Sequence, residues 1–349
     1  MQRQTLYNVQ ALRFLAAAAV ATSHVADLLI AHDTKNVWFW AVPWTAGVDL
    51  FFVISGFIML LLTHGTFGSR QAAVLFLRRR AARLVPSYWL FSSLIVGAVL
   101  LSGGKLKGTT AAVDQIVTSF AFLPWPRDDG KLNPILAQGW TLNYEAFFYV
   151  AFAIALLNRR GAILLSVAFC ALAGTHTLWS EQLFMLRFWS SPIIVEFVAG
   201  MGLAHLYVGG KRLSDGGALL LVALAIALFV ALAYIDLGAY NRVARLGLPA
   251  LLICAGMFFS REPSEFGPVR RFIRLGGDAS YSLYLSHYAI VNLIAMIWKR
   301  IGVHLPWLGV ALGLIASIFF AIAFHLYVER RMTSWVRRRM EPDRLAMMA

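Results

Sequence analysis

Apolar runs of about 20 residues recur along the whole chain and are separated only by short polar or basic stretches. About 20 apolar residues in a helix cross the hydrocarbon core of a bilayer. The 349 residues are 60% hydrophobic and 14% charged, whereas a soluble domain is about half apolar and a quarter charged. We therefore predict an all-α polytopic membrane helix bundle of about ten transmembrane helices, forming one domain over residues 1–349. The expected spans are 10–31, 46–64, 85–102, 142–158, 161–179, 188–208, 216–235, 245–260, 279–298 and 307–328.

The formal net charge of +14 is explained by membrane topology. Cytoplasmic loops of membrane proteins retain Lys and Arg. With ten spans and both termini cytoplasmic, the inner segments hold roughly twice as many basic residues as the outer ones. This predicts a basic cytoplasmic tail at 329–349 and a long outer loop at about 103–141. The lipid bilayer, and no nucleic acid, is the partner that this charge pattern predicts.

No metal or serine-nucleophile motif is evident. Cys170 and Cys254 lie in separate apolar spans and have no metal-ligand spacing, so we predict free thiols and no metal site. Ser55 and Gly56 lack the strand–turn–helix context of a serine hydrolase and are interpreted as close-packing residues of a span.

The first apolar segment contains an arginine and a histidine, Arg13 and His24, eleven positions apart. This is about three helical turns, so both side chains leave one face of the helix, roughly 16 Å apart. Ionisable groups within a bilayer are costly and by default mark a functional path. Residues 1–31 are too long and too polar for a cleaved signal peptide, and we interpret them as a retained helix.

Arg80 and Arg83 lie one helical turn apart in segment 65–84, which we expect to be a cytoplasmic loop that ends where Pro86 begins the third span. Guanidinium pairs bind phosphates in a bidentate manner, which favours a phosphorylated cytoplasmic donor as their ligand. Marking the cytoplasmic side would need only clustered charge, and both interpretations remain open.

Three acidic residues in or near the spans are candidates for a functional role. Asp49 is at the outer end of the second span, where it either has a functional role or caps the helix. Glu145 follows Trp140 by five positions and sits about one turn inside the fourth span; the aromatic residues there also fit an interfacial belt. Glu196 is deeper in an apolar span, where it is either paired with a cation or protonated.

Tyr281, Tyr284 and His287 recur every three positions and form a slanting stripe on one helix face. Counted from the inner end of its span, His287 lies about 12 Å into the membrane, and His24 lies about 21 Å in from the same side. A lone histidine there could serve only in helix–helix hydrogen bonding. Two histidines and an arginine at aligned spacing favour a ladder of polar groups from the cytosol to the outer leaflet. In order, the ladder is Arg13, His287, His24, Glu145 and Asp49.

Six short motifs follow one another between Asn8 and about Arg330. They are Arg13-x10-His24, GVDLFFVISGF at 47–57, Arg80-x-x-Arg83 with Pro86, WTLNYEAFFY at 140–149, EFVAGM at 196–201 and YSLYLSH at 281–287. In this order the chain resembles the acyltransferase family 3 integral-membrane O-acyltransferases, and most of all their exopolysaccharide O-acetyltransferase branch.

The resemblance implies transfer of an acyl group, acetyl in preference to longer groups, from cytoplasmic acyl-CoA to a sugar hydroxyl at the outer face of a bacterial-type inner membrane. Acyl-CoA would be a co-substrate, with no permanently bound cofactor. The acceptor would be a glycan or a lipid-linked sugar, and polysaccharide assembly machinery is a possible partner.

The resemblance also implies roles for the residues singled out above. His24 would be the general base for the acceptor hydroxyl or a transient acyl carrier. Arg13 would hold a donor phosphate or stabilise charge near the thioester. Glu145 would orient the sugar or raise the basicity of His24, and Arg80 and Arg83 would bind the CoA phosphates. The expected substrate-binding residues are Asp49, Trp140, Glu196, Tyr281, Tyr284 and His287.

Two other functions compete with the enzyme hypothesis. Charges at the membrane midplane also suit a transporter or flippase of lipid-linked glycans, although the sequence has no internal repeat or matched pair of interrupted spans. A scaffold of a polysaccharide assembly complex is the third hypothesis. Acylation that depends on acyl-CoA would distinguish the enzyme from both.

Overall fold

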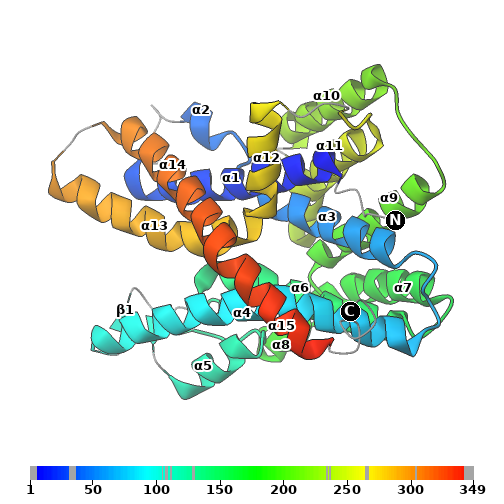
Figure 1. Ribbon diagram of the computed structural model, residues 1–349, viewed down its shortest axis with the longest axis horizontal. Helices are drawn as coiled ribbons and strands as arrows, with labels where there is room; N and C mark the ends of the chain where they lie inside the picture. Colours follow the sequence, from blue (N-terminus) through cyan, green and yellow to red (C-terminus); the bar gives the residue numbers. More distant parts are fainter. Residues whose placement is uncertain are drawn as a thin grey trace. The chain divides into compact units, whose positions relative to one another are not determined.

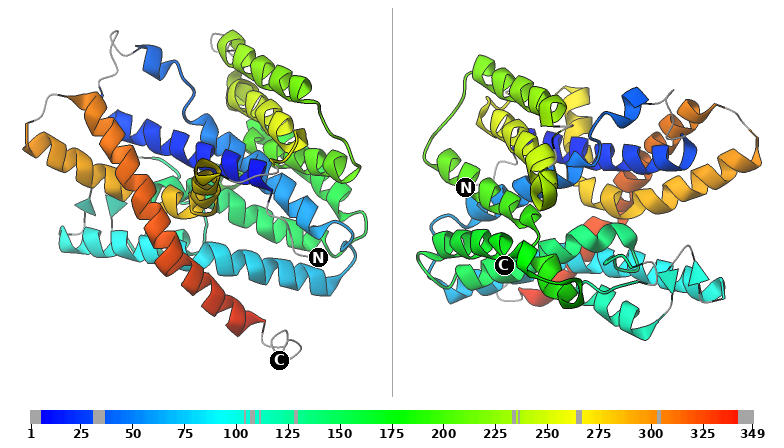
Figure 2. Two further views of the ribbon diagram at one scale, coloured as in Figure 1. Left: turned by 45° about the horizontal axis from the view of Figure 1, so that its top comes forward. Right: turned by 180° about the vertical axis from the view of Figure 1, so that it is seen from behind.

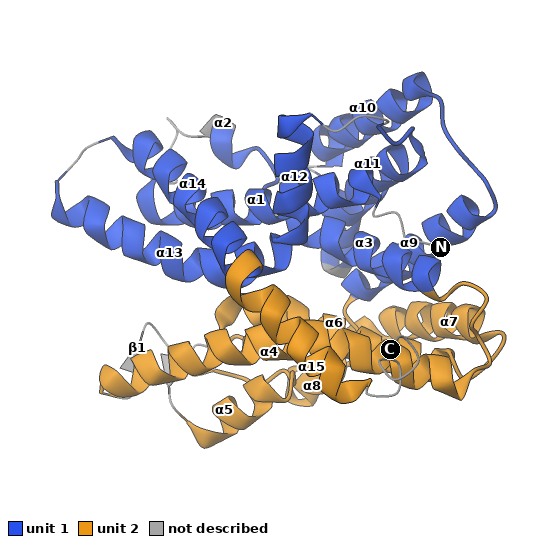
Figure 3. Ribbon diagram, viewed as in Figure 1, with its two compact units in different colours: residues 1–62, 192–325 blue, residues 63–191, 326–349 orange. Residues whose placement is uncertain are grey.

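The computed structural model describes residues 6–30, 37–103, 105–106, 109–110, 112–127, 130–232, 235, 237–263, 267–302 and 305–341. This part of the chain is an all-α bundle apart from a two-residue ladder, in which β1 (Lys105–Leu106) pairs antiparallel with β2 (Thr109–Thr110). The chain divides into two compact units, residues 1–62 with 192–325 and residues 63–191 with 326–349 (Figure 3). Each unit therefore combines segments that are far apart in the sequence.

The first unit is built around α1, which packs against α12, α13 and α14, while α10 packs against α11 (Figures 1 and 2). Its helices are α1 (Tyr7–Leu29), α2 (Val37–Trp40), α3 (Ala46–Thr63), α9 (Val195–Val208), α10 (Asp215–Ala231), α11 (Leu248–Phe259), α12 (Pro268–Asp278), α13 (Ser280–Arg300) and α14 (Pro306–Phe324). Short 3-10 turns (Pro192–Ile194, Gly238–Tyr240) and a π-helical turn, η7 (Val243–Gly247), join them.

The second unit is organised by α4 (Arg70–Leu101), which packs against α6 and α15. Its other helices are α5 (Val113–Phe120), α6 (Trp140–Ala155), α7 (Gly161–Gly174), α8 (Phe184–Trp189) and α15 (Arg330–Met340). Short 3-10 turns lie at Ala137–Gly139, His176–Leu178 and Glu181–Leu183, and a π-helical turn (His325–Glu329) precedes α15.

The predicted all-α bundle of long apolar helices is confirmed. Seven helices in the described residues are long and apolar enough to cross a membrane, and two shorter apolar helices cover 215–231 and 243–259. Each of the ten predicted spans coincides with helical structure, although the last residues of spans 10–31 and 216–235 border or include positions outside the described residues. The end of the predicted tail, 342–349, also lies outside them.

The loop predicted over 65–84 is wrong from Arg70 onward, because α4 begins there and continues to Leu101. Ser69 caps the helix by accepting a hydrogen bond from the backbone N–H of Ala72. Alanine, leucine and arginine, which favour helices, fill the following turns. Pro86 therefore lies within a helix and does not begin one. Hydropathy alone misses this start because the first turns are strongly basic.

Glycines permit close contact between α3 and α9, as expected for Gly56. A Cβ atom on Gly56 would lie 2.1 Å from the carbonyl oxygen of Phe197, and one on Gly200 would lie 2.1 Å from that of Val53. The two helices thus approach backbone to backbone at two reciprocal points, the packing that small residues allow in membranes. The contact fixes how α3 and α9 present their polar residues.

Candidate functional site

Two histidines from α1 and α13 meet in the first unit. His24 Nδ1 lies 2.7 Å from His287 Nε2. The ring planes differ by 4° and the ring centroids are 5.0 Å apart. With such a short N–N contact, this centroid separation requires the rings to lie edge to edge in nearly one plane. A nitrogen lone pair of one ring therefore points at an N–H of the other, which is the geometry of a good hydrogen bond.

The partners of His287 fix which nitrogen carries each proton. His287 Nδ1 lies 3.0 Å from the carbonyl oxygen of Leu283, and a carbonyl can only accept. Nδ1 of a neutral His287 therefore carries the proton, and its Nε2 accepts one from Nδ1 of His24. This leaves Nε2 of a neutral His24 with a free lone pair. Nε2 of His24 can thus act as a base or a nucleophile, and the hydrogen bond to His287 determines the tautomer of His24.

Aromatic side chains surround this histidine pair. The His24 ring meets Tyr288 edge to face at 5.8 Å, and Tyr284 lies 6.0 Å from the His287 ring. His287 is fully buried, Tyr281 and Tyr284 are nearly so, and His24 is partly exposed. Access to the pair is therefore through His24, while α13 supplies a rigid backing.

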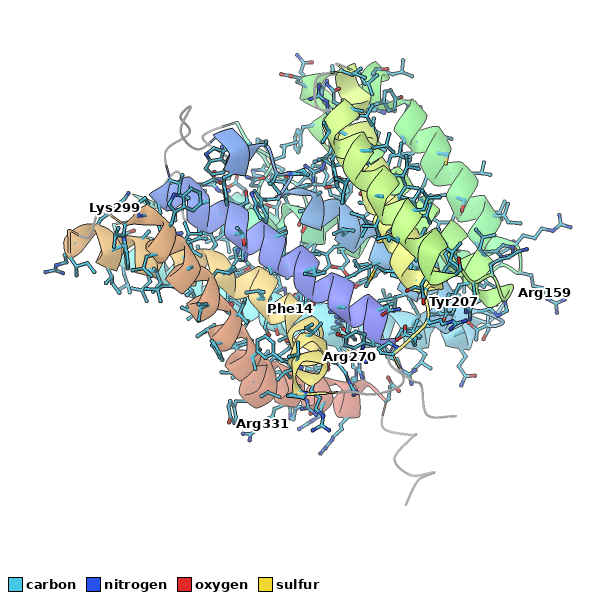
Figure 4. All side chains as sticks on the ribbon, turned by 90° about the horizontal axis from the view of Figure 1, so that it is seen from above. Phe14, Arg159, Tyr207, Arg270, Lys299 and Arg331 are labelled. Atoms are coloured by element: carbon cyan, nitrogen blue, oxygen red, sulfur yellow. The ribbon has the colours of Figure 1, made fainter. Side chains whose placement is uncertain are left out.

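The predicted difference in depth between the histidines is wrong, because a 2.7 Å contact puts them at one level. The prediction aligned the inner ends of the two helices. Instead, α12 crosses α1 closely: a Cβ on Gly277 would lie 2.2 Å from the carbonyl oxygen of Gln10. Figure 4 labels Phe14 of α1 near this crossing. Helix α13 starts directly after α12, so it begins further along α1 than assumed.

Arg13 lies in the same unit and is 7% exposed. Its guanidinium donates a 3.0 Å hydrogen bond to the side-chain oxygen of Gln10, one turn earlier on α1. A buried cation needs polar partners, and Gln10 is one of them. The structure therefore confirms that Arg13 is an interior residue, while its predicted role toward a donor stays a prediction.

A second cluster joins Asp49 of α3, Glu196 of α9 and Arg242 beside the π-helical turn η7. Arg242 donates to Asp49 Oδ2 at 2.7 Å, and Asp49 is fully buried. Glu196 is 3% exposed, and its carboxyl is close enough to Asp49 and Arg242 to interact with their charges. The Glu196 side chain also packs against Gly247, where a Cβ would lie 2.4 Å from Oε1.

The predicted role of Asp49 and Glu196 in binding substrate stays a prediction. Their burial and the Arg242 partner also let them hold α3, α9 and η7 together. Arg242 itself was missed. It precedes the eighth predicted span by three residues, where an arginine is usually an interfacial anchor. An unpaired carboxyl in each of two neighbouring spans was the signal that a cation had to be nearby.

In the second unit, α4 and α6 bring together Arg80, Tyr149 and Glu145. The Arg80 guanidinium lies 5.4 Å from the Phe76 ring centre and 5.6 Å from that of Tyr149. The Tyr149 hydroxyl donates to Glu145 Oε1. Cation–π contact and this hydrogen bond place a guanidinium, a phenol and a carboxylate in one polar group.

This group connects residues that were expected at opposite membrane faces. The backbone N–H of Gly68 bonds the carbonyl oxygen of Leu156, so the start of α4 is level with the end of α6. Arg80 lies twelve positions from Gly68 and Glu145 eleven positions from Leu156, so both are about 16–18 Å from that level along their helices. Arg80 therefore lies well inside α4, and Glu145 of α6 lies at about the same height beside it.

The remaining predicted residues are divided between the two compact units. Arg83 is a neighbouring charge of Tyr149, and the Trp140 ring meets Tyr144 edge to face at 6.0 Å. Arg80, Arg83, Trp140 and Glu145 thus belong to the second unit, and Arg13, His24, Asp49, Glu196, Tyr281, Tyr284 and His287 belong to the first. The predicted influence of Glu145 on His24 stays a prediction.

This chain is similar to known proteins over most of its length. It matches the family described as "Acyltransferase domain" over residues 6–326. It is also 33% identical over 301 residues to the "Exopolysaccharide production protein ExoZ" of Rhizobium meliloti (strain 1021), which covers 82% of this chain and 88% of the relative. No solved structure matches the chain significantly.

Proposed function

Because this chain belongs to the acyltransferase family whose domain covers residues 6–326, we propose that it is a membrane O-acyltransferase that uses a cytoplasmic acyl-CoA. The proposed acceptor is a hydroxyl of a glycan or lipid-linked sugar at the outer face, and the proposed acyl group is acetyl. The observation that carries the proposal is the in-plane His24–His287 hydrogen bond, which leaves Nε2 of His24 free for chemistry.

As general base, Nε2 of His24 would take the proton of the acceptor hydroxyl while that oxygen attacks the thioester carbonyl carbon. The C–S bond then breaks, the thiolate leaves, and the imidazolium returns the proton to sulfur as CoA thiol departs. The products are an O-acyl sugar and free CoA. In the alternative route, Nε2 attacks the thioester itself and an acyl-imidazole passes the group to the sugar.

Both routes need the same tautomer of His24, and His287 maintains it. When His24 gains a proton or an acyl group, its Nδ1–H becomes a stronger donor toward His287 Nε2. The buried His287 ring and its bond to Leu283 keep this acceptor in place. His287 is therefore proposed as the positioning residue of the reaction, with Tyr281 and Tyr284 lining the passage.

We assign proposed roles to the other predicted residues as well. Arg80 and Arg83 bind phosphates of acyl-CoA, and Arg13 holds the donor or stabilises charge at the thioester. Glu145 and Trp140 contact the acceptor sugar. Asp49 and Glu196 shape the first unit through Arg242.

The family and the apolar helices support a multi-pass membrane protein. We propose that it resides in a bacterial-type inner membrane with both termini cytoplasmic, since this orientation keeps most basic residues inside. The name of the Rhizobium relative refers to exopolysaccharide production, and it supports an exopolysaccharide or its lipid-linked precursor as the acceptor, with polysaccharide assembly machinery as a partner.

The test is acyl transfer by the purified full chain. Labelled acetyl-CoA and a de-O-acetylated exopolysaccharide are incubated with the wild type and with His24→Ala in lipid nanodiscs. We expect label in the polysaccharide only with the wild type, and NMR identifies the modified hydroxyl. Transfer by His24→Ala at the wild-type rate would remove the central assignment. Movement of lipid-linked sugar across vesicles without any need for acyl-CoA would favour a transporter.

A further inference from the structure

The C-terminal helix α15 packs against the basic first half of α4 within the second unit. Two hydrogen bonds of 3.0 Å join Arg79 to the carboxylate of Glu341 in a fork. Arg78 also donates to the carbonyl oxygen of Met340 at 3.0 Å. The end of α15 is therefore fixed beside one turn of α4.

The helical spacing then brings two further arginines together. Arg83 follows Arg79 by one turn on α4, and Arg337 precedes Glu341 by one turn on α15, where its carbonyl accepts the Glu341 N–H. Among neighbouring charges, Arg83 acts most strongly on Arg337, and Arg79 acts next. The Arg79–Glu341 ion pair is thus adjacent to Arg83 and Arg337, two positive charges close enough to repel each other.

Three guanidinium groups around a single carboxylate repel one another, at a cost that rises as water is excluded. An anion between Arg83 and Arg337 would turn this repulsion into two attractive contacts. Guanidinium forks match phosphate oxygens in geometry and charge. The Glu341 carboxylate is already held by Arg79, which leaves Arg83 and Arg337 as the donors toward a ligand.

We propose that Arg79, Arg83 and Arg337 form a phosphate-binding site, here named the α4–α15 arginine site, which holds a phosphate of the nucleotide part of acyl-CoA. This rests on the proposed function for the identity of the donor. The site adds Arg337 of the C-terminal helix as a binding residue and gives Glu341 the role of positioning Arg79. The other possible source of the same phosphate chemistry is an anionic lipid headgroup.

The test measures CoA binding by the full chain in nanodiscs of phosphatidylcholine. Arg337→Ala should weaken binding about tenfold, because a charged hydrogen bond is lost. Arg337→Lys, which keeps the charge and loses the fork, should fall between Arg337→Ala and the wild type. The matched control is Arg339→Ala, which removes the same charge from the same helix at a residue whose guanidinium lies 5.4 Å from the Trp335 ring centre. It should change binding by less than about twofold, because the Arg339 guanidinium packs on Trp335 whereas that of Arg337 is next to Arg83 and Arg79.

Equal binding by Arg337→Ala and Arg339→Ala, or no effect of either, would overturn the proposal. A second set of nanodiscs contains phosphatidylglycerol. Loss of bound phosphatidylglycerol from Arg337→Ala with unchanged CoA affinity would assign the site to lipid and also overturn it. The proposed function is separable: unchanged transfer with an unchanged KM for acyl-CoA in Arg337→Ala keeps the enzyme and removes this site. Arg337-dependent CoA binding without any acyl transfer keeps the site and removes the enzyme.

Discussion

The contact between His24 and His287 makes a quantitative prediction about catalysis. Removing the base with His24→Ala should lower the transfer rate by about a thousandfold, within the usual range for general base catalysis. His287→Leu fills a similar volume but removes the acceptor of the His24 proton. It forfeits one hydrogen bond and leaves a buried donor unpaired, about 1.5–3 kcal/mol in all, which corresponds to a ten- to hundredfold loss of rate.

The double variant tests whether the two histidines act as one unit. If His287 works only through His24, the double variant should be no slower than His24→Ala alone, because the losses of coupled residues are not additive. His287→Gln should restore part of the activity of His287→Leu, since its amide oxygen can accept from Nδ1 of His24.

The assay is the initial rate of acetyl transfer in nanodiscs, with the amount of folded protein checked by size-exclusion chromatography. His205→Ala is the matched control, because His205 is an exposed histidine on α9 in the same unit. It should keep the wild-type rate. A double variant whose loss is the product of the two single losses would refute the reasoning, as would a larger loss for His287→Leu than for His24→Ala.

Three other predictions concern packing, charge and donor binding. Gly200→Val should prevent accumulation of folded protein in the membrane, because even its Cβ would lie 2.1 Å from a backbone oxygen of α3; normal accumulation would contradict this packing. Asp49→Asn should lower stability by about 2–3 kcal/mol by leaving Arg242 without its counter-charge, less than for a fully buried pair because the Arg242 side chain is 35% exposed. A wild-type melting temperature of Asp49→Asn would argue against this ion pair. Arg80→Ala with Arg83→Ala should raise the KM for acyl-CoA at least about tenfold and leave the KM for acceptor within about twofold; equal changes would favour a topology role.

The fold follows from the sequence because the bilayer leaves few choices. Backbone groups in hydrocarbon must be satisfied within the segment, so an apolar run of sufficient length becomes a helix. The start of α4 is the exception. Residues 70–84 hold five arginines and read as a cytoplasmic loop, yet tertiary packing on α6 and α15 makes the same residues helical. A hydropathy profile measures the preference of a segment for lipid. It does not identify a charged helix that buries its apolar side against other helices.

The candidate site was only partly predictable, because spacing along one helix does not fix the height of another. The sequence placed Arg13 and His24 on one face, and the tyrosine–histidine stripe on another helix. It could not supply the contact between Arg242 and Asp49, because these residues are 193 positions apart and only the tertiary fold brings them together.

The contact between His24 and His287 depends on the crossing of α12 and α1, which lies away from both histidines. Helix α12 approaches α1 closely because Gly276 and Gly277 have no side chains; a Cβ on Gly276 would lie 2.5 Å from the Phe14 ring. This close crossing, followed at once by α13, determines where Ser280 begins along α1 and therefore which residues of α1 and α13 meet. One residue more or less in this corner would rotate α13 by about 100° and turn His287 away from His24. The contact between the two histidines thus depends on two glycines that touch neither of them. We expect a larger residue at either glycine to misalign the proposed catalytic pair without altering any group proposed to meet the substrate.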